Sequence, residues 1–343
     1  MRIGDRQIGP AHAPYVIAEI GVNHDGSVES ALELIDAAAA AGADAVKLQV
    51  FRAETLMSGG SRLADYQQRA GETDPIEMLR RLELPLEALG DLVRRAHDRS
   101  VHAIATVFSV DLVEPATAHA WDAVKTASPD IVHEPLLRAL EATGLPLIVS
   151  TGAASLDEVE RAARWLADAR ERLAVLQCVS AYPAPADRAA LGAIREIAAQ
   201  TALPVGYSDH TEDVETGAIA VGAGACLLEK HFTHSRAAQG PDHAASLEPE
   251  AFARYAALAR TAHAMLGDGR KAVQDIEREV RTVSRQSLVL LAPVRAGERI
   301  DPALLACRRP GTGLAPWRVR DVAGRVAARD IPADRALVEE DLA

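Results

Sequence analysis

Residues 15–24 read Tyr-Val-Ile-Ala-Glu-Ile-Gly-Val-Asn-His, a short apolar run that ends in polar residues. The run predicts a buried β-strand, because it is short, contains Val and Ile, and is followed by a glycine. An open, doubly wound sheet that binds a dinucleotide would carry a Gly-x-Gly-x-x-Gly turn at this point. Residues 19–24 have a single glycine, Gly21, so this stretch favours a different parallel α/β fold.

Seven further apolar runs follow, and amphipathic stretches such as 30–41, 86–95 and 156–167 lie between most of them. Eight strands alternating with helices over about 250 residues are typical of a (β/α)8 barrel. We therefore predict an α/β fold, a TIM barrel over residues 1–265. The predicted strands are residues 15–20, 45–50, 101–107, 123–126, 145–149, 173–179, 204–207 and 225–230.

The last part of the chain differs from the rest in charge and pattern. Residues 281–343 contain 11 arginines, no lysine and 8 acidic residues, whereas the whole chain of 343 residues has a formal charge of −12. Short β-like runs at 287–291 and 326–331 alternate with Gly and Pro, which predicts a small β-rich domain over 283–343. Residues 266–282 are polar with alternating charge, and we predict a linker or bridging helix there.

Composition excludes several classes of protein. The negative charge argues against a general nucleic-acid binder, which needs a basic face. No run of 18 apolar residues occurs, so we expect no membrane partner. The three cysteines, Cys178, Cys226 and Cys307, are odd in number and far apart, which favours a reduced cytoplasmic protein. The first residues lack the apolar run of a signal peptide.

Polar side chains follow each predicted strand, where a TIM barrel has its active site. Hydroxyl groups there can also cap the next helix, but capping does not explain Lys47, Lys125 and Lys230, whose charges are costly inside a barrel unless they pair with an anion or a carboxylate. The polar residues at the strand ends are Glu19, Asn23, His24, Lys47, Gln49, Thr106, Ser109, Lys125, Ser128, Ser150, Thr151, Ser180, Tyr182, Ser208, Asp209, His210, Glu229, Lys230, His231, Asp242 and His243.

These residue types predict two kinds of binding. Lys47, Lys125 and the hydroxyls suit a substrate that carries phosphate and carboxylate groups. His210 and His231 follow neighbouring strands, and two imidazoles near carboxylates suit a divalent metal with open positions. The alternative is that both histidines are only hydrogen-bonded neighbours of the site.

The segments that decide the family are residues 16–26, 42–49, 150–152, 178–183, 206–211, 229–233 and 240–244. In these segments and in their order the chain resembles the sialic acid synthase family, which condenses phosphoenolpyruvate with an N-acylated amino-sugar. The tail, with Arg309-Pro310-Gly311 and Gly324-Arg325, resembles the antifreeze-like domain of these synthases.

The resemblance implies a role for individual residues. It implies that His210 and His231 hold Mn²⁺ or Mg²⁺ and that Glu19, Glu229 and Lys47 are catalytic. It implies a domain-swapped homodimer, in which Arg309 reaches the partner's site. The implied phosphoenolpyruvate contacts are Lys47, Thr106, Lys125, Ser128, Ser150, Ser180 and Ser208. The implied sugar contacts are Gln49, Tyr182, Asp242 and Arg309.

Several functions remain open at this point. The simplest acceptor is N-acetylmannosamine. The same chemistry on a di-N-acetylated trideoxy-hexose would give legionaminic or pseudaminic acid, and another aldehyde is a further alternative. A non-catalytic carbohydrate-binding protein could use the same barrel, because a fold does not by itself define a function. The tail could also be an independent carbohydrate- or ice-binding module.

Overall fold

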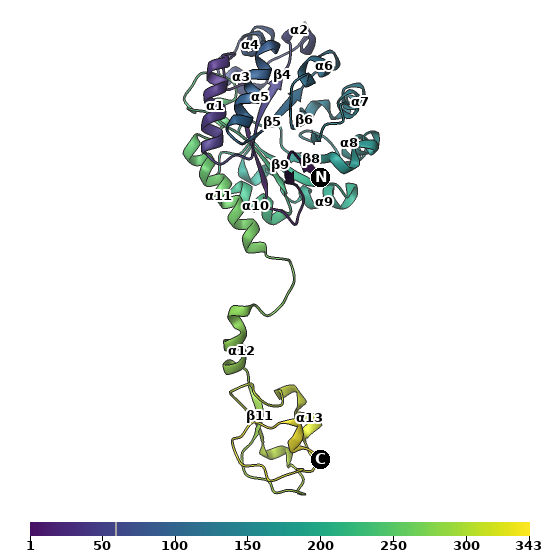
Figure 1. Ribbon diagram of the computed structural model, residues 1–343, viewed down its shortest axis with the longest axis vertical. Coiled ribbons are helices and arrows are strands. Elements are labelled where there is room, and N and C mark those ends of the chain that lie inside the picture. Colours follow the sequence, from purple (N-terminus) through teal and green to yellow (C-terminus); the bar gives the residue numbers. More distant parts are fainter. Residues whose placement is uncertain (59) are drawn as a thin grey trace. The chain divides into compact units, whose positions relative to one another are not determined.

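The computed structural model describes residues 1–58 and 60–343 and divides them into two compact units, Met1–Asp268 and Gly269–Ala343. In the first unit eight parallel strands close into a barrel in the order β10-β3-β4-β5-β6-β7-β8-β9, which confirms the predicted TIM barrel (Figure 1). The strands are β3 (Tyr15–Glu19), β4 (Ala45–Val50), β5 (His102–Val107), β6 (Ala123–Thr126), β7 (Leu147–Ser150), β8 (Leu173–Cys178), β9 (Val205–Asp209) and β10 (Leu227–His231).

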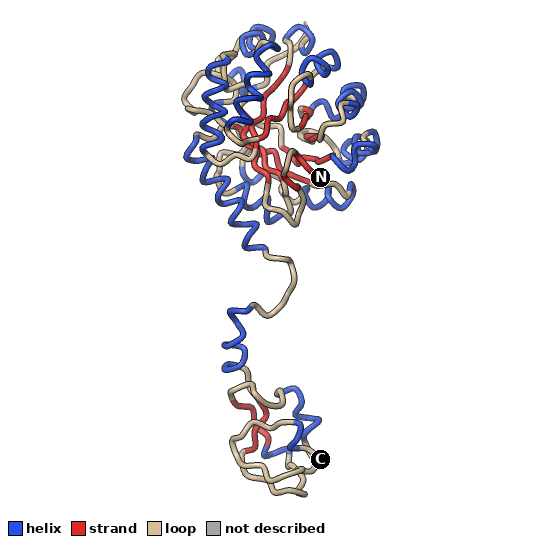
Figure 2. The backbone as a smooth tube through the Cα atoms, viewed as in Figure 1, coloured by secondary structure: helices blue, strands red, loops and turns tan. Residues whose placement is uncertain are grey.

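Helices surround this ring of strands, as Figure 2 shows. Three helices follow β4 before the chain reaches α5, so the connection after β4 is longer than a single helix needs. The helices of the first unit are α1 (Val28–Ala40), α2 (Ala53–Leu56), α3 (Asp65–Arg69), α4 (Pro75–Leu82), α5 (Leu89–Asp98), α6 (Val113–Thr117), α7 (Glu134–Ala142), α8 (Leu156–Trp165), α9 (Ala193–Thr201), α10 (Thr216–Ala223) and α11 (Pro249–Leu266).

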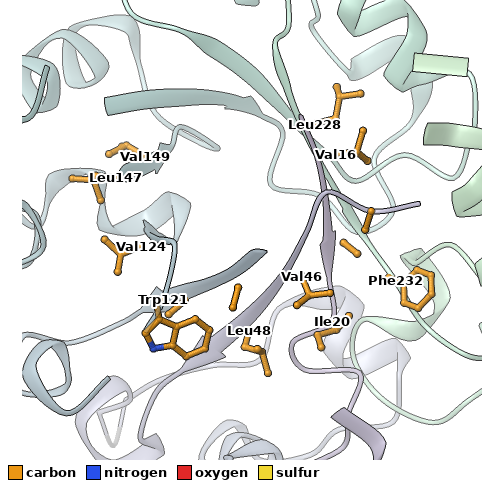
Figure 3. Close-up of a cluster of buried hydrophobic side chains, with 14 of the residues drawn as sticks. Val16, Ile20, Val46, Leu48, Trp121, Val124, Leu147, Val149, Leu228 and Phe232 are labelled. Atoms are coloured by element: carbon orange, nitrogen blue, oxygen red, sulfur yellow. The ribbon is translucent and has the colours of Figure 1, made fainter. Parts of the chain in front are cut away.

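Alternate residues of each strand enter different cores, because successive side chains of a strand point to opposite faces. On β3, Val16 and Ala18 join the large apolar cluster between strands and helices, part of which Figure 3 shows. Tyr15 and Ile17 join a smaller apolar cluster inside the barrel. Glu19 is the next residue on the inner face, and it is fully buried.

The amino end of the barrel is closed by apolar side chains. A short antiparallel hairpin, β1 (Arg2–Ile3) with β2 (Arg6–Gln7), brings Ile3 and Ile8 into the inner cluster. Because apolar side chains fill the amino end of the barrel, the polar residues of the inner face lie toward the carboxyl ends of the strands.

The second unit has its own small core, formed by residues such as Leu288, Ile300 and Leu337. Its regular elements include α12 (Arg278–Ser284), α13 (Val319–Val322) and the antiparallel pair β11 (Ser287–Leu290) with β12 (Leu305–Arg308). The predicted run at 287–291 is therefore a strand. Residues 326–331 are not, because they make only isolated bridges, such as Arg299 with Val326 and Val294 with Ile331.

The stretch predicted as a linker helix, residues 266–282, is helical only in its second half. Helix α11 ends at Leu266, and both Gly267 and Gly269 have a positive φ, a backbone conformation that ends a helix. Regular structure resumes at Asp275–Glu277 and α12. Among the described residues, no helix is long and apolar enough to cross a membrane.

Candidate active site

A cavity of about 480 Å³ opens at the carboxyl ends of the barrel strands. Its walls include fourteen of the fifteen residues that the sequence analysis assigned to the site, so one cavity brings together side chains from all eight strands or the loops after them. They are Glu19, Lys47, Gln49, Thr106, Lys125, Ser128, Ser150, Ser180, Tyr182, Ser208, His210, Glu229, His231 and Asp242. The fifteenth, Arg309, belongs to the second unit, and its role stays a prediction.

The alternation within strands explains why these residues converge. Lys47 and Gln49 are two apart on β4, and Glu229 and His231 are two apart on β10, so each pair lies on the same face. Ser208 on β9 pairs in register with Glu229, which places the two inner side chains side by side.

Two lysines and two glutamates form a buried ionic network at the centre of the cavity. Lys47 pairs with Glu19 and donates a hydrogen bond of 2.9 Å to Thr106 Oγ1. Glu229 Oε1 lies 3.4 Å from Lys125 Nζ and 3.9 Å from Lys47 Nζ. Because each charge has an opposite partner, the four side chains can remain ionised although they are buried. A lysine of the network can also release a carboxylate and bind an anionic ligand in its place.

Burial changes the protonation of this network. It lowers the pKa of Lys47 to about 7, although Glu229 opposes the shift. Burial alone would raise the pKa of Glu229, but Lys125 and Lys47 together bring it below its usual value. Glu229 is thus held as a carboxylate, whereas Lys47 can gain or lose a proton near neutral pH.

Serine hydroxyls line the side of the cavity next to Lys125. The Gly152 N–H donates to Ser128 Oγ at 3.0 Å. A Cβ at position 152 would collide with Ser180 Oγ and lie 2.8 Å from Ser128 Oγ, so glycine leaves room for both hydroxyls. Lysines and hydroxyls clustered in this way are suited to phosphate and carboxylate oxygens.

His210 and His231 face each other with ring centroids 5.5 Å apart. His210 Nδ1 lies 2.8 Å from the Val179 carbonyl oxygen, which can only accept, so Nδ1 carries a proton and Nε2 is the nitrogen that has a lone pair when the ring is neutral. This is the arrangement by which proteins orient a metal-binding imidazole. The Cys178 thiol also lies 3.7 Å from His210 Nδ1.

The second imidazole is available to a ligand as well. His231 Nδ1 is buried without a hydrogen-bond partner among the described residues, and burial keeps the pKa of His231 well below its usual value. Asp242 Oδ2 lies 3.5 Å from this nitrogen, and burial raises the pKa of Asp242 to about 6. Within residues 1–58 and 60–343, no three His, Cys, Asp or Glu side chains form a ready metal-binding set. A metal held by these two histidines would take its other ligands from substrate or water.

One wall of the cavity was missed by the sequence analysis. It comes from the long connection after β4 and from the residue after β5, and apart from Tyr66 and Gln67 it is apolar: Leu56, Met57, Ala64, Met78, Leu79 and Phe108. The ring of Tyr66 of α3 packs against that of Tyr182, and their centroids are 4.8 Å apart. The centroid of the Tyr182 ring lies 4.1 Å from that of the His210 ring. Asp130, also missed, lines the cavity near Ser128, and burial raises its pKa to about 6.

Asp209 and Lys230 of the strand-end set do not line the cavity, and neither do Asn23, His24, Ser109, Thr151 and His243. Asp209 and Lys230 each lie between two inward-facing residues, so the alternation of the strand turns them to the outer face. There they form an ion pair with an Oδ2–Nζ distance of 3.2 Å. Assigning alternate residues of β9 and β10 to opposite faces in the sequence would have separated Asp209 and Lys230 from the site residues.

The profile of the NeuB family matches residues 34–271, and that of the SAF domain matches residues 285–343. The chain belongs to the NeuB family. The first match begins within α1 and extends past the end of α11, so it covers most of the cavity residues, and the second covers the β11–β12 pair. The resemblance drawn from the motifs is confirmed.

Named relatives agree with this membership. The chain is 35% identical to the N,N'-diacetyllegionaminic acid synthase of Legionella pneumophila, over 99% of this chain and 97% of that protein. It is 33% identical to the synthase of the same name from Campylobacter jejuni, over 94% and 98%. The crystal structure of the N-acetylneuraminic acid synthetase of Leptospira borgpetersenii, in complex with citrate, has 31% identity and a TM-score of 0.75, covering 82% of this chain and 94% of that one.

Proposed function

We propose that this NeuB-family chain is a synthase that joins phosphoenolpyruvate to the open-chain aldehyde of a di-N-acetylated trideoxy-hexose, releasing phosphate and a legionaminic-acid-type nonulosonic acid. The observation that carries the proposal is the cavity at the carboxyl end of the barrel, where two lysines, two glutamates, two histidines and a set of hydroxyls converge.

The lysine and serine side of the cavity supports the phosphoenolpyruvate part. Lys125 and Lys47 can balance the phosphate and carboxylate charges, and Ser128, Ser150 and Ser208 can donate to their oxygens. Because the site is buried, these interactions are stronger than they would be in water.

The apolar wall supports a deoxy-sugar as the acceptor. Leu56, Met57 and Leu79 offer no hydrogen-bond partner to a hydroxyl group but can pack against a methyl group. The names of the Legionella and Campylobacter relatives point to the same acceptor class. The Leptospira structure supports N-acetylmannosamine, the simplest acceptor expected from the motifs, as the second candidate.

The chain's own residues account for the course of the reaction. Carbon C3 of phosphoenolpyruvate attacks the aldehyde carbon, and positive charge develops at C2. The carboxylates of Glu19 and Glu229 lie in the cavity to stabilise that charge. Water then adds at C2, and phosphate leaves by C–O cleavage while Lys125 and the serines hold it. Lys47, with its pKa near 7, can transfer a proton during these steps.

A divalent metal, Mn²⁺ or Mg²⁺, completes the proposal. His210 and His231 would hold it, and when bound it would supply Lewis-acid polarisation of the aldehyde oxygen.

We further propose a domain-swapped homodimer in which Arg309 contacts the partner's sugar. A cytoplasmic location is supported by the three cysteines, Cys178, Cys226 and Cys307, all of which are free thiols.

The test measures phosphate release from phosphoenolpyruvate with Mn²⁺, with and without a chelator, and determines the mass of the product. The acceptors are 2,4-diacetamido-2,4,6-trideoxy-hexoses and N-acetylmannosamine in parallel. The proposal expects chelator-sensitive release with a higher kcat/KM for the deoxy acceptors. A higher kcat/KM for N-acetylmannosamine would make N-acetylmannosamine the acceptor in place of the deoxy-sugar. No phosphate release with any aldehyde would overturn the synthase function.

A further inference from the structure

A buried ion pair lies directly behind the two histidines. Lys230 and Asp209 are both fully buried, and they face each other in register on the neighbouring strands β10 and β9. Lys230 Nζ lies 3.2 Å from Asp209 Oδ2 and donates a hydrogen bond to the Thr211 carbonyl oxygen. Asp209 precedes His210, Thr211 follows it, and Lys230 precedes His231.

The pair is buried among large side chains of the outer core, two of which are tyrosines. Residues of the outer apolar cluster flank it on the strands, Tyr207 and Leu228, and Tyr255 of α11 adds a ring whose centroid lies 5.6 Å from Lys230 Nζ. A Cβ at Gly217 of α10 would collide with the Tyr255 ring, so the helix carries glycine where that ring approaches. Transferring a lysine and an aspartate to such a position is costly, and apolar residues of similar size often stabilise a core equally well.

The contacts of the pair fix the backbone on both sides of His210. Asp209 Oδ1 accepts from the Thr211 N–H at 2.9 Å and from the Thr211 hydroxyl at 2.8 Å, which closes a turn around His210. Lys230 holds the outer end of the same turn through the Thr211 carbonyl. The Thr211 hydroxyl also lies 3.0 Å from that of Thr216, the first residue of α10.

We propose that Lys230 and Asp209 are positioning residues that hold His210 and His231 at the separation and orientation that a divalent metal requires. The inference rests on the metal site of the proposed function. The ion pair does not touch substrate. It ties the turn that carries His210 to the strand that carries His231, and a site with only two protein ligands depends on their geometry.

The experiment replaces the pair by apolar residues of similar length, Asp209→Leu with Lys230→Met, in the full chain. This double variant removes one positive and one negative charge, so the net charge near the histidines does not change. Mn²⁺ is titrated in the absence of substrates, and the free ion is followed by its electron paramagnetic resonance signal. Thermal unfolding and phosphoenolpyruvate affinity are measured on the same samples.

The matched control is Thr126→Val, which also makes a buried polar residue on the outer face of a barrel strand apolar. We expect the double variant to keep its unfolding midpoint and phosphoenolpyruvate affinity, while its Kd for Mn²⁺ rises about 10-fold or more. Thr126→Val should bind Mn²⁺ as the wild type does. A double variant with the wild-type Kd would overturn the proposal.

A second variant covers the case in which the double variant does not fold. Thr211→Val removes only the hydroxyl that Asp209 accepts from, and it should weaken Mn²⁺ binding several-fold. Wild-type Mn²⁺ affinity in Thr211→Val would then overturn the positioning role. Failure of the proposed function is distinguishable, because in that case the wild-type chain itself would show no Mn²⁺ binding and no phosphate release.

Discussion

Lys125 Nζ lies 3.4 Å from Glu229 Oε1, and both side chains are almost completely buried. Ser208 donates to the same oxygen at 3.0 Å, whereas Glu229 Oε2 has no hydrogen-bond partner among the described residues. A buried carboxylate with one free oxygen, held between a lysine and a hydroxyl, can stabilise positive charge without rearrangement.

Lys125→Met should raise the KM for phosphoenolpyruvate by about 10- to 100-fold, the range for loss of a charged hydrogen bond worth about 1.5–3 kcal/mol. The KM for the acceptor should change much less. Initial rates at varied phosphoenolpyruvate measure the effect. Arg161→Met, which removes an exposed charge on α8, is the control, and an unchanged KM in Lys125→Met would remove Lys125 from the substrate site.

The affinity for phosphoenolpyruvate should fall as the pH rises through about 7. Burial lowers the pKa of Lys47 to about 7, so above that pH the ammonium that attracts the anion is lost. Glu229 raises the pKa of Lys47, so Glu229→Gln should move the fall to lower pH. The profile of kcat/KM for phosphoenolpyruvate from pH 5.5 to 9 measures the fall and its shift in the variant. An identical profile in Glu229→Gln would contradict the effect of Glu229 on the pKa of Lys47.

Gly152→Ala should impair phosphoenolpyruvate binding through the serines. The added methyl group would displace the hydroxyls of Ser180 and Ser128, which it would otherwise contact far too closely. We expect a higher KM for phosphoenolpyruvate, with an unfolding midpoint within a few degrees of the wild type. Gly192→Ala, where a Cβ has open space, is the matched control. Equal kinetics in the two variants would show that the hydroxyls do not contact the substrate.

His231→Ala should abolish chelator-sensitive turnover while the barrel stays folded, because the buried Nδ1 makes no hydrogen bond that the fold needs. We expect at least a 100-fold loss of kcat, in line with the removal of a metal ligand. Turnover and thermal unfolding are compared with those of His234→Ala, an exposed histidine nearby in the chain. Turnover of His231→Ala at the wild-type rate would exclude His231 as a metal ligand.

Arg309→Ala should raise the KM for the acceptor sugar more than that for phosphoenolpyruvate, if the second unit of one chain covers the site of its partner. Arg320→Ala removes another exposed arginine of the same unit and serves as the control. Steady-state kinetics with each substrate varied in turn provide the comparison. Equal effects of Arg309→Ala on both KM values would contradict a contact with the sugar.

Local patterns in the sequence were enough to predict the barrel and most of the polar side chains that line the cavity. A strand such as Tyr15–Glu19 has apolar residues on both faces. This pattern is typical of a parallel sheet whose outer face is covered by helices and whose inner face encloses a barrel core. Since parallel strands align their carboxyl ends, polar residues after each strand must meet at one end of the barrel. The order of residues along the chain was therefore sufficient to place Glu19, Lys47 and His231 together.

Only the tertiary structure decided what else lines the cavity. The outward direction of Asp209 and Lys230 follows from the alternation of the strand, but their pairing between strands and helices depends on how those elements pack. Tyr66 and the apolar wall come from a connection without a repeating pattern, and their contact with Tyr182 joins residues more than a hundred positions apart. Periodicity along the chain determines which face a side chain takes, whereas contacts between distant segments depend on how whole elements pack.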